Sequence, residues 1–521
     1  MKVSCLDFTE TGQFAPIFID YIAQKETLKS FYNRPASVEQ FEDQIKEKTN
    51  AKINRNLLVE VLKEQYQQAN IADELTTAQL NSLADNKTFT LTTGHQLNIF
   101  TGPLYFHYKI ITVINACKKL KSLYPAYNFI PVYWMATEDH DLDEIRSFNI
   151  KGERFKWTTA QTGAVGSMQT NGLKELAEQA DPEGTLFQET YANAKNLSEA
   201  TLKYVQALYG EEGLITLDAD KASLKAAFKS VIKDDVINHT ANDLVEKQSA
   251  RLEDLNYKTQ IFPRAINFFY LSDSSRERIV KTEQHYEVLN TNIRFSEAEI
   301  VKEIDDYPER FSPNVILRPL LQEVLLPNLA YTGGPAEVAY WLQLKPVFDY
   351  YKVAFPILLP RNFGLVIPNR IQHKLNKLKI GDTAIFIEKE QLKKDVTRKI
   401  SSQKLHLNEE KQQLQQLLRE IKEHAGHIDA SLEEMTSAET QKAMNALDKI
   451  EKKMMAAEKR KHADKMRQID EVKDVLFPGG VPQERTENFL AFYRSDDQFL
   501  KSLLQRFDPF NLKFHLMRWD G

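Results

Sequence analysis

The sequence predicts an α/β fold with a parallel-sheet core, followed by a long antiparallel α-helical coiled coil. The first indication is a stretch rich in β-branched residues at 88–93 (TFTLTT), which precedes a helical pattern over 103–123 and an apolar stretch at 128–136 (NFIPVYWMA). A strand, a helix and a second strand at this spacing form a βαβ unit, which places both strands in one parallel sheet. The second indication is an apolar heptad repeat within residues 386–476, which is typical of coiled-coil helices.

The stretch at 128–136 scarcely alternates between apolar and polar residues, which predicts a strand that is buried on both faces. Further strands are expected at 214–217, 265–271 and 355–359. The polar stretch 146–212 is expected to be an insertion that carries small elements of its own. The predicted catalytic core, with this insertion, occupies residues 1–385.

The predicted coiled coil over residues 386–476 begins with an apolar residue at every seventh position. These positions are Leu407, Leu414, Ile421 and Ile428. Because Gly426 disfavours a helix interior, the break between the two arms is expected at 424–427. The second arm would run over 432–475 and, at ~1.5 Å per residue, extend for ~65 Å. The sequence FPGG should stop it, and the C-terminal segment 477–521 should pack back on the core. We interpret the coiled coil as a homodimerisation element; the alternative is a hairpin that folds on its own domain.

The composition excludes several classes of function. The 521 residues include 68 basic and 73 acidic side chains, and the resulting net charge of −5 provides no overall field for holding a nucleic acid. An apolar run of ~18 residues, which a membrane span needs, is absent, as is the apolar core of a signal peptide. The two cysteines, Cys5 and Cys117, are too few for a disulfide scaffold. We therefore expect a cytoplasmic protein that binds neither membranes nor nucleic acid.

A glycine-bearing segment between the first predicted strand and the following helix is a candidate phosphate site. Its candidate residues are Gly94, His95, Gln96, Thr101, Gly102, His107 and Lys109. In a parallel sheet, ligands bind at the carboxyl ends of the strands, and the N–H groups of a helix N-terminus attract phosphate. The glycines would let the backbone approach a ligand, and the imidazole and ammonium groups could donate to a polyphosphate. The alternative is a structural connection in which one histidine bonds a carbonyl group.

The strongest candidate site follows the second strand directly, where five carboxylates and one imidazole occur within seven residues. These residues are Glu138, Asp139, His140, Asp141, Asp143 and Glu144. Crowding of like charges makes it costly to ionise all of them unless a cation or an amine is bound. The cluster could bind a substrate ammonium, act as general acid and base, or hold a divalent metal. An acidic helix N-terminus is the alternative, and it accounts better for the last three residues than for the first three.

A third group of candidate residues lies farther along the chain. It comprises Arg318, Gly333, Gly334, Glu337 and Arg361. Paired glycines that open a helix permit close approach to a ribose or a phosphate, and a glutamate there could accept from sugar hydroxyls. The alternative is a turn with a structural Arg–Glu pair. Arg276 and Arg278 are weaker candidates, because the start of one surface helix would account for them.

Several long motifs give the sequence a resemblance to a known family. They are TTGHQLNIFTGPLYFHYK, PVYWMATEDHDLDEI, FSPNVILRPLLQEVLLPNLAYTGGPAEVAYW, PRNF and PGGVPQERTENF, in this order. Over nearly its whole length the chain resembles the BshC family of bacillithiol biosynthesis. The resemblance implies a Rossmann-like core with connecting insertions, similar to class I aminoacyl-tRNA synthetases and nucleotidyltransferases, and a dimerising coiled coil. It also implies a ligase that joins L-cysteine to glucosaminyl malate through an amide bond.

The implied reaction requires an activated carboxyl group, because a free carboxylate does not acylate an amine at a useful rate. We therefore expect ATP or ADP as a nucleotide cosubstrate and no tightly bound metal. By analogy with the synthetases, His95 and the segment through His107 would stabilise phosphate charge. Gly333, Gly334 and Glu337 resemble the ribose-binding region of those enzymes.

The resemblance also suggests roles for the remaining candidates. Catalytic roles would fall to His95, Asp139 and His140, and substrate-binding roles to Glu138, Asp141, Arg318 and Arg361. The carboxylates would hold the ammonium of cysteine or the sugar amine, one of Asp139 and His140 would be the general base, and the guanidinium groups would bind the malate carboxylates. Two other functions remain open: a metal-dependent hydrolase that uses the acidic cluster, and a non-enzymatic coiled-coil assembly protein.

Overall fold

The computed structural model describes residues 1–493 and 498–519, which divide into two compact units. Unit 1 consists mainly of Val3–Leu365 and Pro482–Met517, and unit 2 mainly of Val366–Val481. The candidate site residues all lie in unit 1. Within the described part of the chain, no helix has both the length and the apolar character needed to cross a membrane.

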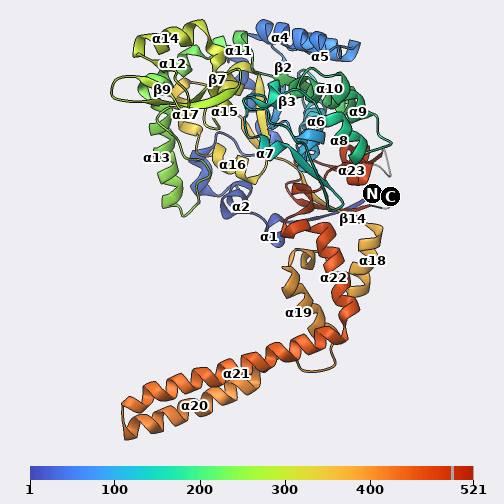
Figure 1. The fold of residues 1–521 in the computed structure, drawn as a ribbon, viewed down its shortest axis with the longest axis vertical. Helices are drawn as coiled ribbons and strands as arrows, with labels where there is room; N and C mark the ends of the chain where they lie inside the picture. Colours follow the sequence, from blue (N-terminus) through green and yellow to red (C-terminus); the bar gives the residue numbers. More distant parts are fainter. Residues whose placement is uncertain (494–497, 520–521) are drawn as a thin grey trace. The chain divides into compact units, whose positions relative to one another are not determined.

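Unit 1 is organised around a five-stranded sheet in which neighbouring strands are parallel (Figure 1). In spatial order the strands are β13 (Ile357–Pro360), β12 (Asn328–Gly333), β2 (Thr88–His95), β3 (Asn128–Met135) and β6 (Ile215–Asp218). The chain runs outward from β2 to β3 and β6, and then returns to the other side of β2 to form β12 and β13. This Rossmann-like order creates a topological switch point between β2 and β12, where ligands bind in open α/β sheets.

The two central strands form where the sequence predicts them. In β2 the residues from Thr88 to Thr93 are buried, and in β3 every residue after Asn128 is buried. Helices cover both faces of such a sheet, which explains why neither strand alternates. The predicted strands at 214–217 and 355–359 are also confirmed, as β6 and β13. Strand β12 was not predicted, because its short segment NLAYTG resembles part of a glycine turn.

Helices surround the sheet, and α6 (Tyr105–Leu123) packs directly on β2 and β3. Likewise α10 (Leu197–Tyr209) packs on β6, and α16 (Pro335–Trp341) packs on β12 and β13. The other helices of unit 1 are α1 (Phe8–Thr11), α2 (Pro16–Ile22), α3 (Phe41–Thr49), α4 (Arg55–Gln68), α5 (Glu74–Ser82), α7 (Leu142–Ile145), α8 (Leu173–Ala180), α9 (Leu186–Asn193), α11 (Ala222–Ala226), α12 (Lys229–Asn238), α13 (Thr240–Asp254), α14 (Glu297–Asp306), α15 (Arg318–Leu325), α17 (Lys345–Tyr351), α23 (Leu490–Tyr493) and α24 (Gln498–Arg506). Residues 146–212 contain the hairpin β4 (Ser147–Ile150) and β5 (Glu153–Lys156) together with α8, α9 and α10.

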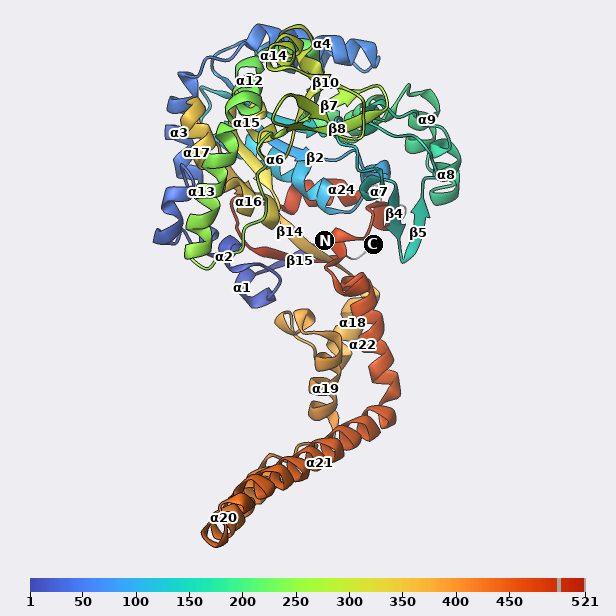
Figure 2. The same ribbon diagram turned by 60° about the vertical axis from the view of Figure 1, so that its left-hand side comes forward.

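A second five-stranded sheet in unit 1 is antiparallel, and Figure 2 shows its β7 and β8 near α12 and α14. Its strand order is β10 (Arg294–Phe295), β9 (Tyr286–Val288), β8 (Ser275–Lys281), β7 (Phe268–Ser272) and β11 (Phe311–Pro313). The strand expected at 265–271 is β7 and therefore belongs to this sheet. Arg276 and Arg278 lie on β8, so the expected helix start is wrong, because a tight turn at 273–274 joins β7 to β8 as a hairpin. A third sheet has the order β1 (Lys2–Leu6), β15 (Phe514–Trp519) and β14 (Phe363–Pro368).

Unit 2 is helical, and its two longest helices form the predicted antiparallel hairpin (Figure 1). Its helices are α18 (Asn369–Leu378), α19 (Lys389–Ile400), α20 (Asn408–Ile428), α21 (Ser431–Lys461) and α22 (Ala463–Leu476). The break expected at 424–427 is wrong, because α20 continues through Gly426 and the turn comes at 429–430. One glycine costs a helix only about 1 kcal/mol. The turn is instead stabilised at Asp429, whose side chain accepts a hydrogen bond from Ser431 N at 2.8 Å. The second arm is also interrupted, at His462, before it ends ahead of the FPGG sequence.

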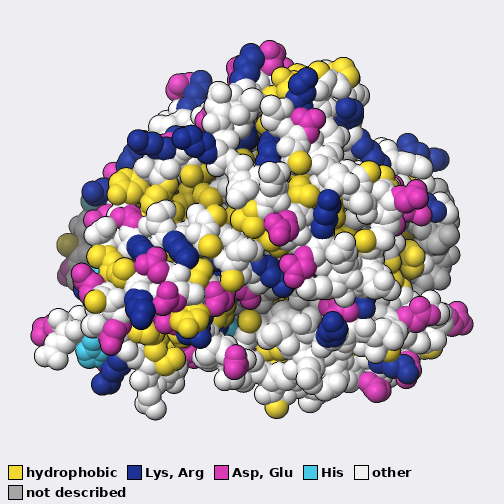
Figure 3. Space-filling model, turned by 90° about the horizontal axis from the view of Figure 1, so that it is seen from above, with side chains coloured by type: hydrophobic (Ala, Val, Ile, Leu, Met, Phe, Trp, Pro, Cys, Tyr) yellow, Lys and Arg dark blue, Asp and Glu magenta, His cyan; other side chains and the backbone are white. Residues whose placement is uncertain are grey.

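The surface carries charges of both signs. In Figure 3, Lys and Arg side chains are interspersed with Asp and Glu side chains across the face seen from above, and hydrophobic side chains lie in groups between them. This mixture agrees with the small net charge of −5.

Candidate active site

A cavity of about 720 Å³ lies at the switch point between β2 and β12. The lining includes ten residues that are candidates from the sequence: Gly94, His95, Gln96, Lys109, Glu138, Asp139, Glu144, Arg276, Arg318 and Glu337. The other described candidates lie outside the lining: Thr101, Gly102, His107, His140, Asp141, Asp143, Arg278, Gly333, Gly334 and Arg361. Three segments that are far apart in the sequence therefore meet at one cavity.

The His95 side chain at the end of β2 is half-buried and lines the cavity. Its ring centroid lies 5.2 Å from that of Tyr105, and within the described residues its Nε2 atom has no hydrogen-bond partner. Burial, reinforced by the positive charges of Lys109 and Arg361, holds the pKa of His95 well below its usual range. His95 is therefore a neutral imidazole with one nitrogen available to a ligand.

Lys109 and Glu337 form an ion pair that connects the ends of β2 and β12, the strands on either side of the switch point. The Lys109 ammonium donates to Gly94 O at 2.8 Å and lies 2.7 Å from a Glu337 oxygen. Glu337 also accepts from Gly334 N at 2.8 Å and from the Tyr331 hydroxyl at 2.6 Å. Burial disfavours the charged carboxylate, but Lys109 and the Gly334 N–H outweigh it and lower the pKa of Glu337. These contacts use both Glu337 oxygens within the wall of the cavity.

Asp139 and Glu144 form an acidic corner of the cavity that is held by one amide side chain. Gln96 donates from Nε2 to Asp139 Oδ2 at 2.8 Å and also to a Glu144 oxygen. The other Asp139 oxygen accepts from His140 N at 2.8 Å. The Asp139 carboxylate is thus fixed in orientation while its side chain remains 27% exposed.

The two residues that follow Asp139 point elsewhere. His140 lines an adjoining cavity of about 370 Å³, where its Nδ1 atom lies 3.2 Å from Arg276 Nη1. Asp141 is the N-cap of α7 and accepts from Glu144 N at 3.3 Å. The helix N-terminus that was the alternative interpretation of the acidic cluster therefore accounts for Asp141.

Glu138 is paired with a lysine that the sequence analysis did not consider. Lys225, on α11, places its Nζ atom 2.5 Å from Glu138 Oε1 and 2.7 Å from Asp220 Oδ1, and it donates to Glu309 O at 2.7 Å. The Lys225 side chain is 1% exposed. Burial raises the pKa of Glu138, and the Lys225 ammonium opposes this shift. No local pattern marks Lys225, because its partner lies far away in the sequence.

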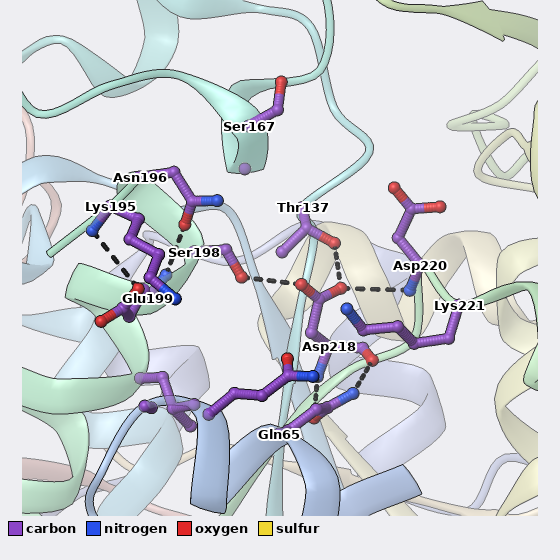
Figure 4. Close-up of a pocket in the computed structure, with 14 residues that line it drawn as sticks. Gln65, Thr137, Ser167, Lys195, Asn196, Ser198, Glu199, Asp218, Asp220 and Lys221 are labelled. Atoms are coloured by element: carbon purple, nitrogen blue, oxygen red, sulfur yellow. Dashed lines mark hydrogen bonds between the residues drawn. The ribbon is translucent and has the colours of Figure 1, made fainter.

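A smaller cavity of about 270 Å³ lies next to this network (Figure 4). Its central carboxylate is Asp218, at the end of β6, which accepts from Thr137 Oγ1 at 2.6 Å, from Ser198 Oγ at 2.7 Å and from Asp220 N at 3.0 Å. Burial raises the pKa of Asp218. Thr137 and Glu138, although adjacent in the sequence, thus line different cavities.

The phosphate role expected for the start of α6 is not supported by the placement of its residues. The Thr101 hydroxyl lies 2.9 Å from His107 Nε2, and the Tyr209 hydroxyl lies 2.6 Å from His107 Nδ1. Burial lowers the pKa of His107 to about 3, so the ring is neutral. Gly102 has a φ of 67°, and a Cβ atom there would lie 2.7 Å from Asn98 Cβ. These residues shape the backbone behind the cavity.

The two arginines expected to bind malate have different environments. Arg318 lines the cavity and donates from Nη1 to Gln322 Oε1 at 3.1 Å, while its buried Nη2 atom has no hydrogen-bond partner in the described structure. Arg361 instead forms a buried ion pair with Glu484, 2.7 Å from Nη2 to Oε1, in which the side chains are 3% and 4% exposed. Arg318 is therefore open to an anion, whereas Arg361 matches the structural-pair alternative.

The chemistry of the cavity follows from this arrangement. The lining carries carboxylates that attract an ammonium group and guanidinium groups that attract a carboxylate or phosphate. The neutral imidazole of His95 lies in the same lining, at the end of β2. No group of three or more His, Cys, Asp or Glu side chains suited to a metal ion occurs within the described residues.

Comparisons with known proteins match this chain to one family over nearly its whole length. The family model described as "Bacillithiol biosynthesis BshC, N-terminal Rossmann-like domain" matches residues 1–362, and that of the BshC C-terminal coiled-coil domain matches residues 364–519. A relative from Flavobacterium psychrophilum is 42% identical and covers 99% of this chain and 100% of its own. Relatives from Flavobacterium johnsoniae, at 40% identity with the same coverage, and Christiangramia forsetii, at 38% with 99% of each chain covered, share its name, "Putative cysteine ligase BshC".

Proposed function

The chain belongs to the BshC family of bacillithiol biosynthesis, and from this premise we propose that it is a cytoplasmic ligase that joins L-cysteine to glucosaminyl malate through an amide bond. The names of its relatives support cysteine as one substrate. The observation that carries the proposal is the cavity at the switch point, whose lining combines carboxylates with a guanidinium that has an unpartnered donor. Such a site suits two substrates that bring an amine and carboxylates.

The reaction begins when a carboxylate oxygen of cysteine attacks a phosphorus atom of a nucleotide such as ATP. Attack at the α-phosphorus gives an adenylate and releases pyrophosphate, and attack at the γ-phosphorus gives an acyl phosphate and releases ADP. The sugar amine then attacks the activated carbonyl carbon, forms the C–N bond and loses a proton to a base. The nucleotide or phosphate group leaves with the electron pair of the broken C–O bond. Asp139 is the better-placed base, because it lines the main cavity and is oriented by Gln96, whereas His140 lines the adjoining one.

The other cavity residues take supporting roles. Glu138 attracts an ammonium group, Arg318 binds a substrate carboxylate, and the neutral His95 forms a hydrogen bond to the activated group. The glycine at the end of β2 leaves room for this group, since the position of a Cβ on Gly94 would lie 3.6 Å from Arg318 Nη1.

Mass spectrometry of the protein incubated with cysteine, glucosaminyl malate and ATP tests the proposal. We expect a product with the combined mass of the two substrates less one water, and Asp139→Asn should abolish it. Asp349→Asn is the matched control, because its side chain is 60% exposed in a surface ion pair on α17. Product formation without nucleotide would overturn the activation step. Absence of product with either ATP or ADP would overturn the ligase.

The coiled coil supports a second part of the proposal, a homodimer. Along α20 the described side chains are not buried, and Leu417, Ile421 and Ile428 are 53%, 46% and 81% exposed. A second copy of the hairpin would cover these apolar side chains. Light scattering should give twice the chain mass of 60.2 kDa, and Ile421→Glu should give the single-chain mass. A wild-type chain of single mass would instead support a hairpin that folds alone.

A further inference from the structure

We propose that Phe262 and Arg264, at the mouth of the cavity, recognise the sugar–dicarboxylate substrate. In this assignment the Phe262 ring packs on a face of the sugar, and the Arg264 guanidinium binds one of the two carboxylates. The inference rests on the proposed function. It names the residues that distinguish glucosaminyl malate from cysteine and from the nucleotide. Neither residue attracts attention in the sequence, because FPR reads as an ordinary loop between α13 and β7.

The first observation is the exposure of Phe262. Its side chain is 75% exposed, the most of any large hydrophobic residue described in unit 1, and it lines the cavity. Val315, which is 41% exposed, lines the same cavity. An aromatic ring left in water beside a polar cavity is stabilised when a ligand covers it.

The second observation is that the cavity contains two guanidinium groups open to a ligand. Within the described residues the Arg264 guanidinium makes no hydrogen bond or ion pair, and Arg318 Nη2 also lacks a partner. By contrast, Arg276 is engaged by Ser312 Oγ at 3.0 Å and by Pro313 O at 3.2 Å. Two open guanidinium groups match the two carboxylates of malate, so Arg264 takes the place that sequence reasoning gave to Arg361.

The third observation is that the backbone on both sides of the Phe262 position is fixed by buried side chains. Gln343 is fully buried, accepts from Ile261 N at 3.2 Å and donates to Ile261 O at 2.9 Å. The buried Asp235 carboxylate accepts from Asn267 N at 2.6 Å, and Asn267 Oδ1 accepts from Arg264 N at 3.2 Å. The backbone of this segment therefore has little freedom left to lose on binding.

The combination favours a sugar bearing carboxylates over the other two substrates. Cysteine has no ring to cover the aromatic face. A purine base could stack on Phe262, but the base carries no negative charge for Arg264, and the phosphates of its nucleotide lie beyond the ribose. A pyranose attached to a dicarboxylate satisfies both side chains at once.

Isothermal titration of the full chain with glucosaminyl malate alone tests this inference. We expect Phe262→Ala and Arg264→Ala each to weaken binding about tenfold, while affinity for cysteine and for ATP stays within about twofold. Phe262→Tyr should retain binding, because it keeps the aromatic face. Tyr350→Ala is the control for loss of an exposed aromatic, since Tyr350 is 51% exposed on α17. Thermal melts should be unchanged for all variants, because the altered side chains are exposed.

The possible outcomes separate this inference from the proposed function. If Phe262→Ala weakens ATP binding and leaves glucosaminyl malate binding intact, Phe262 is a nucleotide platform and the inference is overturned. Unchanged affinity in both alanine variants, with normal product formation, overturns the recognition role alone. A wild-type chain that neither binds nor couples glucosaminyl malate refutes the proposed substrate itself.

Discussion

Lys225→Met tests how much the ion pairs of Lys225 with Glu138 and Asp220 contribute to the stability of the fold. Methionine keeps most of the length and apolar packing of the lysine stem, but it removes the ammonium that lies 2.5 Å from Glu138 and 2.7 Å from Asp220. Both carboxylates then remain in place without this partner. The perturbation therefore removes one charge, together with its hydrogen bond to Glu309 O, and keeps the packing.

The size of the stability loss follows from how deeply these three side chains are buried. Removing one partner of a buried ion pair costs about 3–5 kcal/mol, because the remaining charge stays out of water. The Lys225 side chain is 1% exposed, but those of Glu138 and Asp220 are 14% and 30% exposed, so water partly solvates them. We therefore expect the free energy of unfolding to fall by the lower figure, about 3 kcal/mol.

The structure also predicts how the free energy of unfolding of Lys225→Met changes with pH. Burial already raises the pKa of Glu138 above 4.5, and loss of Lys225 raises it further. In the variant, folded Glu138 holds a proton that the unfolded chain releases, so the variant loses stability as pH rises above 4.5. The deficit relative to wild type should therefore be larger at pH 8 than at pH 5.

Urea unfolding at these two pH values measures both effects. Tryptophan fluorescence reports mainly on unit 1, because Trp134, Trp157 and Trp341 lie there. Wild type, Lys225→Met, Glu138→Gln and the double variant complete a cycle, and the double variant should lose less stability than the sum of the two single losses. A loss below about 1 kcal/mol, or two additive single effects, would refute the reasoning.

Three further predictions follow from single residues. Burial raises the pKa of Asp235 to about 7, so the folded wild type loses stability from this group as pH rises from about 4 to 7. Asp235→Asn should reduce this dependence of the melting temperature on pH. An unchanged pH dependence would contradict the assignment. A thiol reagent should label Cys5 alone in the folded chain, because Cys117 is buried and burial raises the pKa of its thiol; mass spectrometry showing both sites labelled would be the opposite result. Gly102→Ala should lower the free energy of unfolding by about 2 kcal/mol, because φ is 67° and the new Cβ would contact the Asn98 side chain. A urea midpoint equal to that of wild type would exclude this strain.

Local patterns predicted much of the fold. The strands at 88–93 and 128–136 were visible because a strand buried on both faces needs continuous apolar or β-branched residues. By contrast, β12 has six residues, including a glycine, and becomes a strand through pairing with β2 and β13. A heptad repeat likewise revealed the coiled coil. The position of its turn was not predicted, because Gly426 carries only a weak helix penalty and the turn is stabilised by the bond between Asp429 and Ser431 N.

The candidate site was predicted in the same uneven way. Asp139 and Glu138 were conspicuous because acidic residues crowd one short segment. Lys225 and Arg264 were not, because a single basic residue on a helix or in a loop has no signature until the fold brings it to its partners. Charge density can be read along a chain, whereas complementarity between distant segments cannot.

The division of unit 1 in the sequence has a consequence for its synthesis. The loop behind the cavity contains a left-handed run, with φ values of 53°, 70° and 67° at Phe100, Thr101 and Gly102, and the Asn488 side chain donates to the carbonyl oxygens of Phe100 and Gly102 at 2.8 and 2.7 Å. A ribosome adds Asn488 only after the whole helical hairpin of unit 2 has been made. Until then the nascent α/β layer lacks these two hydrogen bonds, although Tyr191 and His107 can already bond to the loop. The loop behind the cavity therefore gains its last side-chain contacts late in translation.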